Sequence, residues 1–178
     1  SNSFDLIIKN GSVINGNGKP EYKADVGIKN GKIIAIENLS NASADKIINA
    51  KGLKVVPGFI DIHSHTDTNL IVNPKAESKI RQGVTTEICG QDGSSWGPVG
   101  GPNLEKQLQN FKEEYGEELS WRTLGEFLDN FSQRKFSPNL ASMLGLGTIR
   151  KVVVGLDNRP ATSDEIKQMQ KIVVKAFE

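Results

Sequence analysis

The chain has 178 residues, of which 37% are hydrophobic and 24% charged, and its formal net charge at neutral pH is +1. This balance, without a long block of one sign, argues against nucleic acid, a membrane surface or a polyanion as partner. No apolar run reaches the roughly 20 residues of a membrane span, and the single cysteine excludes an internal disulfide framework and favours a cytoplasmic location.

Residues 1–56 have the pattern of short strands separated by turns. The apolar stretches that predict strands cover residues 4–9, 12–15, 24–29, 32–37, 46–49 and 53–56. The pairs Asn10-Gly11 and Asn30-Gly31 lie between such stretches and predict hairpins, because a type I′ turn needs a positive φ at both central residues. We expect a small β unit, too thin at about 55 residues to bury a large core alone.

From residue 57 onward the pattern alternates between strands and helices. Strands are predicted at residues 59–63, 84–89 and 140–147, and helices at residues 74–82, after the glycine-rich segment 90–101, at residues 123–134 and from residue 163 on. This alternation is typical of a parallel α/β sheet or barrel. Since a closed (β/α)₈ barrel takes about 250 residues, the segment is either a small open α/β sheet or the front of a longer protein.

The last predicted helix carries its own start signal. Thr162 and Glu165 form the pattern of a capping box. The helix that follows has Ile166, Met169 and Phe177 on one face, together with Val173, and we expect that face to be buried.

The only two histidines, His63 and His65, lie at the end of the first strand predicted after Pro57. Residues two apart on a strand face the same side, so both imidazoles are expected to point to one place. Parallel α/β folds place their active sites at such strand ends, and two imidazoles suit a divalent metal such as zinc. The alternative is a pair of surface histidines without a ligand.

Several segments carry a family resemblance. PGFIDIHSHTD at residues 57–67 resembles the metal-binding first strand of the amidohydrolase superfamily, and FDLIIKNGSVINGNG and ADVGIKNGKIIAIENL resemble that superfamily's N-terminal β-sandwich portion. GVTTEICGQDG, SWRTLGEFLDNF and GLGTIRKVVVG, the last followed by DNRPATSDEIKQM, resemble the D-aminoacylase (N-acyl-D-amino-acid deacylase) branch. The resemblance spans nearly the whole chain.

The resemblance implies a fold and a function. Residues 1–56 would be part of a small β-sandwich, and residues 57–178 the first strands and helices of a metal-dependent (β/α)₈ barrel. The activity implied is hydrolysis of the amide bond of small N-acyl-D-amino acids by zinc-activated water, with one or two metal ions and with His63 and His65 as ligands. Because the other ligands and the catalytic carboxylate of this family come from later strands, we expect the 178-residue chain alone to be inactive.

Two other functions remain open at this point. Cyclic-amide hydrolases of the dihydroorotase and dihydropyrimidinase type share the first-strand motif. A non-catalytic scaffold with the same fold is the other alternative, although retention of both histidines argues against it.

The sequence departs from the branch at a metal-ligand position. The branch has a cysteine ligand in a Gly-Asn-Cys-Gly stretch, and the aligned position here is Asp92, with Cys89 three residues earlier. A carboxylate at residue 92 can bind divalent ions, with a preference shifted towards oxygen-loving metals, or Asp92 is a turn residue before glycine. We expect Cys89 to be a small buried hydrophobe.

Five further residues are of interest, and three of them have two possible roles each. Asp67 either orients a histidine ligand or caps a helix, and Trp96 either lines a substrate pocket or covers the edge of the core. Arg150 either pairs with a carboxylate or is solvated, and Leu146 stands where the branch has a histidine. Asp61 should share the face of the histidines and needs a partner if buried, which the sequence does not identify.

Overall fold

The computed structural model describes residues 3–178, which divide into two compact units between Pro57 and Gly58. The strands of the first unit are β1 (Ser3–Lys9), β2 (Ser12–Val13), β3 (Tyr22–Lys23), β4 (Asp25–Lys29), β5 (Lys32–Glu37), β6 (Ser43–Asn49) and β7 (Lys54–Val55). They build one sheet in the order β5-β4-β1-β6 and a second in the order β3-β2-β7. Phe4, Ile7 and Leu39 form the buried centre of this unit.

The two Asn-Gly pairs behave differently. Asn30 and Gly31 have φ values of 50° and 70° and connect the antiparallel strands β4 and β5, which confirms the predicted hairpin. The hairpin predicted at Asn10-Gly11 is wrong, because β1 and β2 belong to different sheets and, of the pair, only Asn10 has a positive φ. Gly11 serves close packing instead, since a Cβ there would lie 2.5 Å from Cγ2 of Val55.

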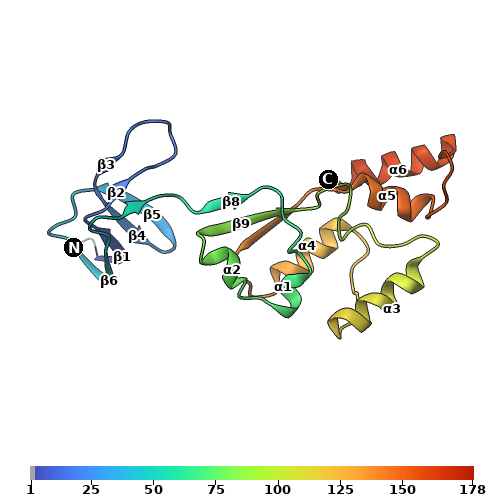
Figure 1. Cartoon of the computed structure of the whole chain (residues 1–178), viewed down its shortest axis with the longest axis horizontal. Coiled ribbons are helices and arrows are strands. Elements are labelled where there is room, and N and C mark those ends of the chain that lie inside the picture. The colour runs from blue at the N-terminus through green and yellow to red at the C-terminus, as the bar shows by residue number, and fades with distance from the viewer. Residues whose placement is uncertain (1–2) are drawn as a thin grey trace. The chain divides into compact units, whose positions relative to one another are not determined.

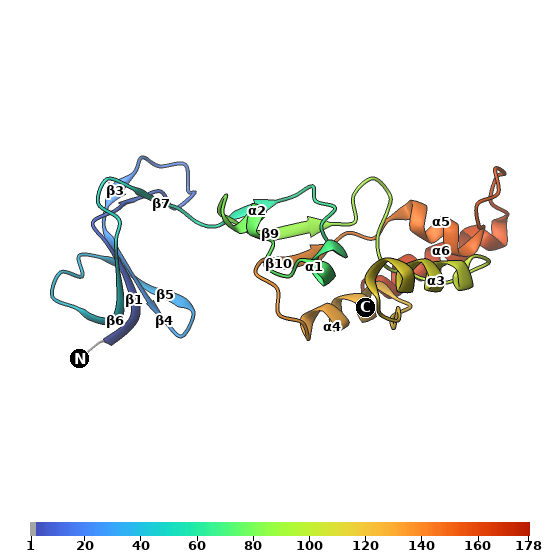
Figure 2. The same cartoon turned by 60° about the horizontal axis from the view of Figure 1, so that its bottom comes forward.

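The second unit is a mixed α/β structure around a parallel sheet (Figure 1). Its elements are β8 (Phe59–Asp61), α1 (Asn69–Val72), α2 (Glu77–Ile80), β9 (Val84–Cys89), α3 (Leu104–Tyr115), α4 (Leu124–Ser132), β10 (Asn139–Ser142), α5 (Leu146–Val153) and α6 (Ser163–Ala176). The sheet has the order β10-β9-β8, and β9 pairs in parallel with both neighbours. The arrows of β9 and β10 accordingly point the same way (Figure 2). Across residues 3–178, the helices all fall short of the length and apolarity that crossing a membrane requires.

An aromatic core supports this sheet. Trp121, Phe111 and Phe127 are almost completely buried, and their rings meet edge to face, with the Trp121 centroid 5.2 Å from Phe111 and 5.3 Å from Phe127. The apolar stripe predicted for residues 123–134 is confirmed, because α4 buries Leu124, Phe127 and Phe131. Leu140 of β10 packs against this core.

The strand predicted at residues 140–147 needs correction. The strand β10 ends at Ser142, and Leu146 begins the helix α5, which the sequence pattern did not predict. The reason is a close approach of two loops: a Cβ on Gly145 would lie 2.5 Å from the carbonyl oxygen of Gly93. The same oxygen accepts a hydrogen bond from the N–H of Thr148 in the first turn of α5. The short helix α1 was not predicted either.

The last helix confirms one prediction and corrects another. The Thr162 hydroxyl accepts a hydrogen bond from the Glu165 N–H, and the Glu165 carboxylate accepts one from the Thr162 N–H, so the capping box is present. The expected burial of its apolar face is wrong: no residue of α6 is buried, and Ile166 and Phe177 are 45% and 86% exposed. This face lines an apolar groove shared with α5, its neighbour in Figure 1.

Candidate metal site

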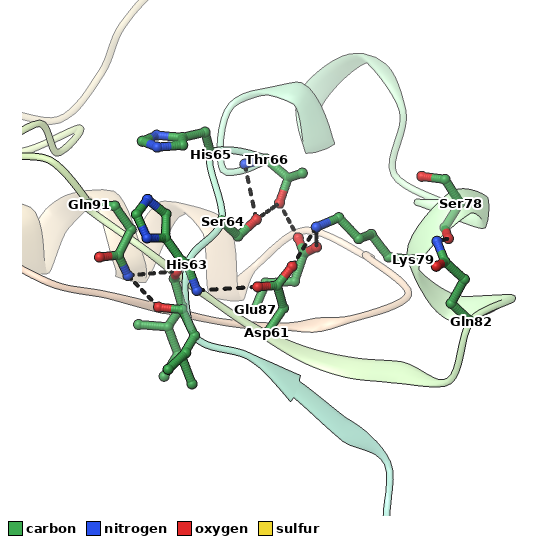
Figure 3. Close-up of polar contacts among 12 residues, drawn as sticks. Asp61, His63, Ser64, His65, Thr66, Ser78, Lys79, Gln82, Glu87 and Gln91 are labelled. Atoms are coloured by element: carbon green, nitrogen blue, oxygen red, sulfur yellow. Dashed lines mark hydrogen bonds and ion pairs between the residues drawn. The ribbon is translucent and has the colours of Figure 1, made fainter.

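The two histidines lie on a loop and not on a strand. Because β8 ends at Asp61, the prediction of a strand through residue 63 is wrong. The alternation nevertheless continues in the loop, since Ser64 is 2% exposed between two exposed histidines, and its N–H donates to the carbonyl oxygen of Ile88 at 3.1 Å. Figure 3 shows both imidazoles on one side of the loop and the Ser64 and Thr66 side chains on the other. The ring centroids of His63 and His65 are 5.5 Å apart.

Asp92 meets both histidines from the turn after β9. Its Oδ2 lies 3.2 Å from Nε2 of His63 and 3.1 Å from Nε2 of His65. Hydrogen bonds from His63 and His65 hold the pKa of the Asp92 carboxyl below its usual value. Asp92 has a φ of 55°, a left-handed conformation that aspartate tolerates better than most residues. The same turn is tied to the histidine loop by Gln91, whose side-chain amide donates to the carbonyl oxygen of Ile62.

This arrangement fits a divalent metal. The ligand atoms of His63, His65 and Asp92 all lie within 4.8 Å of one another, and within residues 3–178 this is the one group of three such side chains so placed. Two imidazole nitrogens and one carboxylate oxygen form a donor set that zinc accepts. The side chains are 59%, 57% and 68% exposed, so they leave room on the open side for further ligands.

Cys89 is placed where it cannot join this group without rearrangement. It is fully buried at the end of β9. Burial is the main cause that raises the pKa of the Cys89 thiol to about 11. Since a thiol binds metal as the thiolate, these surroundings favour the role of a small hydrophobe.

The other predicted site residues lie in different surroundings. Asp67 is buried, and its Oδ1 accepts from the N–H of Thr68 just before α1, while burial raises the pKa of its carboxyl. Trp96 packs edge to face on Phe111, with ring centroids 5.6 Å apart, and lines a cavity of about 320 Å³. It therefore both covers the core and faces an open space. The histidines are not among the residues that line this cavity.

Arg150 has a structural contact that neither sequence interpretation included. Its Nη2 donates to the carbonyl oxygens of Asp157 and Arg159, at 3.0 and 2.6 Å, and so holds the loop before α6. Leu146 is 70% exposed at the start of α5.

Sequence reasoning missed a polar cluster around the buried Glu87, on the inner side of the histidine loop. Lys79 of α2 places its Nζ 2.7 Å from Oδ2 of Asp61 and 3.0 Å from Oε1 of Glu87, a fully buried carboxylate on β9 (Figure 3). Lys79 is the main cause that lowers the pKa of the Asp61 carboxyl, and it is the partner that Asp61 required. A glutamate within the apolar run of β9 was the available signal, because a buried carboxylate needs a cation or donor; nothing in the sequence pointed to Lys79.

Comparisons with known proteins agree with the fold, although no family model matches the chain. A D-aminoacylase of Alcaligenes xylosoxydans xylosoxydans is 35% identical over 177 residues, which is 99% of this chain and 36% of the relative. A dihydroorotase of Elusimicrobium minutum is 49% identical, but over 59 residues that cover 33% of this chain and 14% of the relative.

Two solved structures superpose on nearly the whole chain. The N-acyl-D-glutamate deacylase of Bordetella bronchiseptica, complexed with zinc and a phosphonate that mimics the tetrahedral intermediate, has a TM-score of 0.84 and 28% identity over 98% of this chain and 36% of its own. A D-aminoacylase that defines a subset of amidohydrolases has a TM-score of 0.80 and 35% identity over 97% and 36%. The chain thus spans about a third of the length of these relatives. In sequence and in fold it is related to the D-aminoacylase branch of the amidohydrolases and matches the N-terminal part of their structures.

Proposed function

We propose that the protein containing this chain is a metal-dependent hydrolase that cleaves the amide bond of N-acyl-D-amino acids. The observation that carries this proposal is the convergence of His63 Nε2 and His65 Nε2 on one carboxylate oxygen of Asp92. Similarity to D-aminoacylases over nearly the whole chain supports the reaction class. The shorter match to a dihydroorotase does not favour the cyclic-amide alternative.

In this proposal His63, His65 and Asp92 hold a divalent metal ion, and the zinc found in the related N-acyl-D-glutamate deacylase favours zinc here. A divalent ion bound there would lower the pKa of a water molecule towards about 7 and so supply a nucleophile for amide hydrolysis. The chain's own contribution is to orient two imidazoles and one carboxylate towards the same point. The family resemblance implies a cysteine ligand at the position of Asp92, so this metal site would have a carboxylate where the family has a thiolate.

The proposal extends to the fold and to the surroundings of the site. The parallel order β8-β9-β10, with helices in each connection, supports assignment of residues 57–178 to the first part of a (β/α)₈ barrel, and residues 1–56 to part of a β-sandwich. Trp96 lines a cavity next to the loop that follows β9, which supports a role in a substrate pocket. Asp67 and Arg150 have contacts that favour support of neighbouring loops over contact with substrate. The cytoplasmic location stays a prediction.

The decisive experiment measures metal content and substrate turnover of the full-length protein. We expect stoichiometric divalent metal, loss of activity on chelation, and release of amine from N-acetyl-D-amino acids but not from their L-enantiomers. Hydantoins and dihydroorotate belong in the same panel, since preferential ring opening would indicate the cyclic-amide class. Absence of bound metal together with no amine release from any N-acyl-D-amino acid would refute the proposal.

A further inference from the structure

A continuous set of polar contacts joins the two ends of the His63–His65 segment. At one end, the His63 N–H donates to Oδ1 of Asp61 at 3.2 Å, and the other oxygen of that carboxylate lies 2.7 Å from Lys79 Nζ. Lys79 continues to Glu87 at 3.0 Å, and the far oxygen of Glu87 accepts from the Thr66 hydroxyl. The contacts therefore start at the amide of the first histidine and return to the residue after the second (Figure 3).

The hydroxyl of Thr66 also contacts Ser64 within the loop. It lies 2.7 Å from the Ser64 hydroxyl, and the Ser64 Oγ accepts from the Thr66 N–H at 3.3 Å. Ser64 is the buried residue between the two exposed histidines. Because the side chains of Ser64 and Thr66 are held towards the interior, the imidazoles of the alternate residues, His63 and His65, are directed to the opposite side of the loop.

The burial of these groups makes the arrangement costly unless it is complete. Glu87 is 0% exposed, and the side chains of Lys79 and Asp61 are 24% and 29% exposed. A buried ion pair is seldom more stable than apolar residues of the same volume, whereas an incomplete one is strongly destabilising. Stability alone therefore does not explain why a lysine lies between two carboxylates here. The contact of the cluster with the histidine loop suggests that it positions that loop.

We infer that Lys79, Glu87 and Thr66 act as positioning residues, a clamp that holds the His63–His65 loop in the geometry needed to bind metal. The clamp joins three elements: α2 through Lys79, β9 through Glu87, and the loop itself through Thr66. α2 is in turn fixed at its start by Ala76, which is buried and has a left-handed φ of 43°. This inference rests on the proposed metal site, but the rigidity of the loop can be tested without metal.

The test uses two substitutions at one position in the otherwise unchanged protein. Thr66→Val keeps the shape of the side chain but removes the hydroxyl, so the link from Glu87 to the loop is lost while the pair of Glu87 with Lys79 remains. Thr66→Ser keeps the hydroxyl and serves as the conservative rescue. Thr86→Val is the matched control, because residue 86 is next to Glu87 on β9 and faces the opposite side.

Two readouts separate positioning from general stability. Zinc affinity is measured by competition with a chromophoric chelator, and amide hydrogen exchange at residues 63–66 is measured in the metal-free protein. We expect Thr66→Val to raise the zinc dissociation constant about 10- to 100-fold and to speed exchange in the loop about tenfold. Thr66→Ser and Thr86→Val should stay within about threefold of the wild type in both readouts.

The possible failures are distinguishable. If the wild type binds no divalent metal, the proposed function fails, and the exchange data alone then decide whether the clamp exists. If the wild type binds zinc but Thr66→Val matches it in affinity and exchange, the clamp is refuted and the metal site stands. Equal weakening by Thr66→Val and Thr66→Ser would also refute it, because the hydroxyl would then not be the cause.

Discussion

Two polar clusters occupy opposite sides of one short loop, and they differ in exposure. The group formed by His63, His65 and Asp92 has side chains that are 57–68% exposed, whereas those of Asp61, Lys79 and Glu87 are 0–29% exposed. The exposed cluster can exchange its hydrogen bonds for a ligand at little cost in folding free energy, and the buried one cannot. In the two proposals above, metal binding and loop rigidity therefore depend on different residues, and each can be removed separately.

The largest expected effect is on stability and comes from the buried cluster. Lys79→Met leaves the buried Glu87 without its cation, so we expect the free energy of unfolding to fall by about 4 kcal/mol, measured by urea denaturation. The double variant Lys79→Met/Glu87→Gln should recover much of this loss, because the fully buried carboxylate is then neutral and only the partly exposed Asp61 is left without its cation. Lys112→Met is the control, since its pair with Glu118 is exposed and the urea midpoint should not change. Equal destabilisation by the single and double variants would contradict the assignment.

The next effect is on metal binding and comes from the exposed cluster. His63→Ala and His65→Ala each remove one donor, and we expect zinc affinity to fall about 100-fold as measured by chelator competition. The urea midpoint of the metal-free protein should stay near that of the wild type, because both side chains are exposed. A marked loss of stability without metal would show that the two clusters are not separate.

A smaller effect concerns the identity of the metal. Asp92→Cys replaces a hard carboxylate with a thiolate, and we expect the preference for zinc over manganese to rise about tenfold. Competition between the two ions measures this ratio. Asp92→Asn, which keeps the shape and tolerance of the left-handed conformation, should weaken both ions without changing their ratio. An unchanged ratio in Asp92→Cys would show that residue 92 does not bind the metal.

The smallest effect is expected at Cys89, and it tests whether the thiol has any part in the exposed cluster. Cys89→Ala should leave zinc affinity within about twofold of the wild type, because the thiol is buried and stays protonated near neutral pH. Since the folded-state pKa is raised to about 11, reaction with a thiol reagent should be slow at pH 8 and should quicken as the pH rises towards 11. Rapid labelling at pH 8, blocked by zinc, would contradict this.

The sequence predicted features that depend on local rules and missed those that depend on distant contacts. The β9 strand, the α4 stripe, the Thr162 capping box and the Asn30-Gly31 hairpin follow from periodicity and backbone preference, and all are present. The Asn10-Gly11 hairpin failed because β1 pairs with β4 and β6, whereas β2 pairs with β3 and β7 in a different sheet.

The same distinction applies to the candidate site. Proximity of His63 and His65 follows from their spacing, although the reason is a buried Ser64 in a loop and not a continued strand. Their contacts with Asp92, which is 29 residues from His63 and 27 from His65, were expected only from the resemblance to amidohydrolases. The contact of Lys79 with Glu87 was not expected at all, because no local rule connects a helix surface lysine to a particular buried strand residue.

Ala76, the residue just before α2, has a consequence for how the histidine loop could evolve. Its left-handed backbone costs about 1–2 kcal/mol for a residue with a Cβ, and a glycine would remove that strain. The glycine would lose about 0.5–1 kcal/mol through greater freedom of the unfolded chain and about 0.8 kcal/mol of methyl burial. These terms nearly cancel, so mutation between alanine and glycine at residue 76 is close to neutral for folding. Selection could therefore adjust the mobility of the helix that carries Lys79 almost independently of stability.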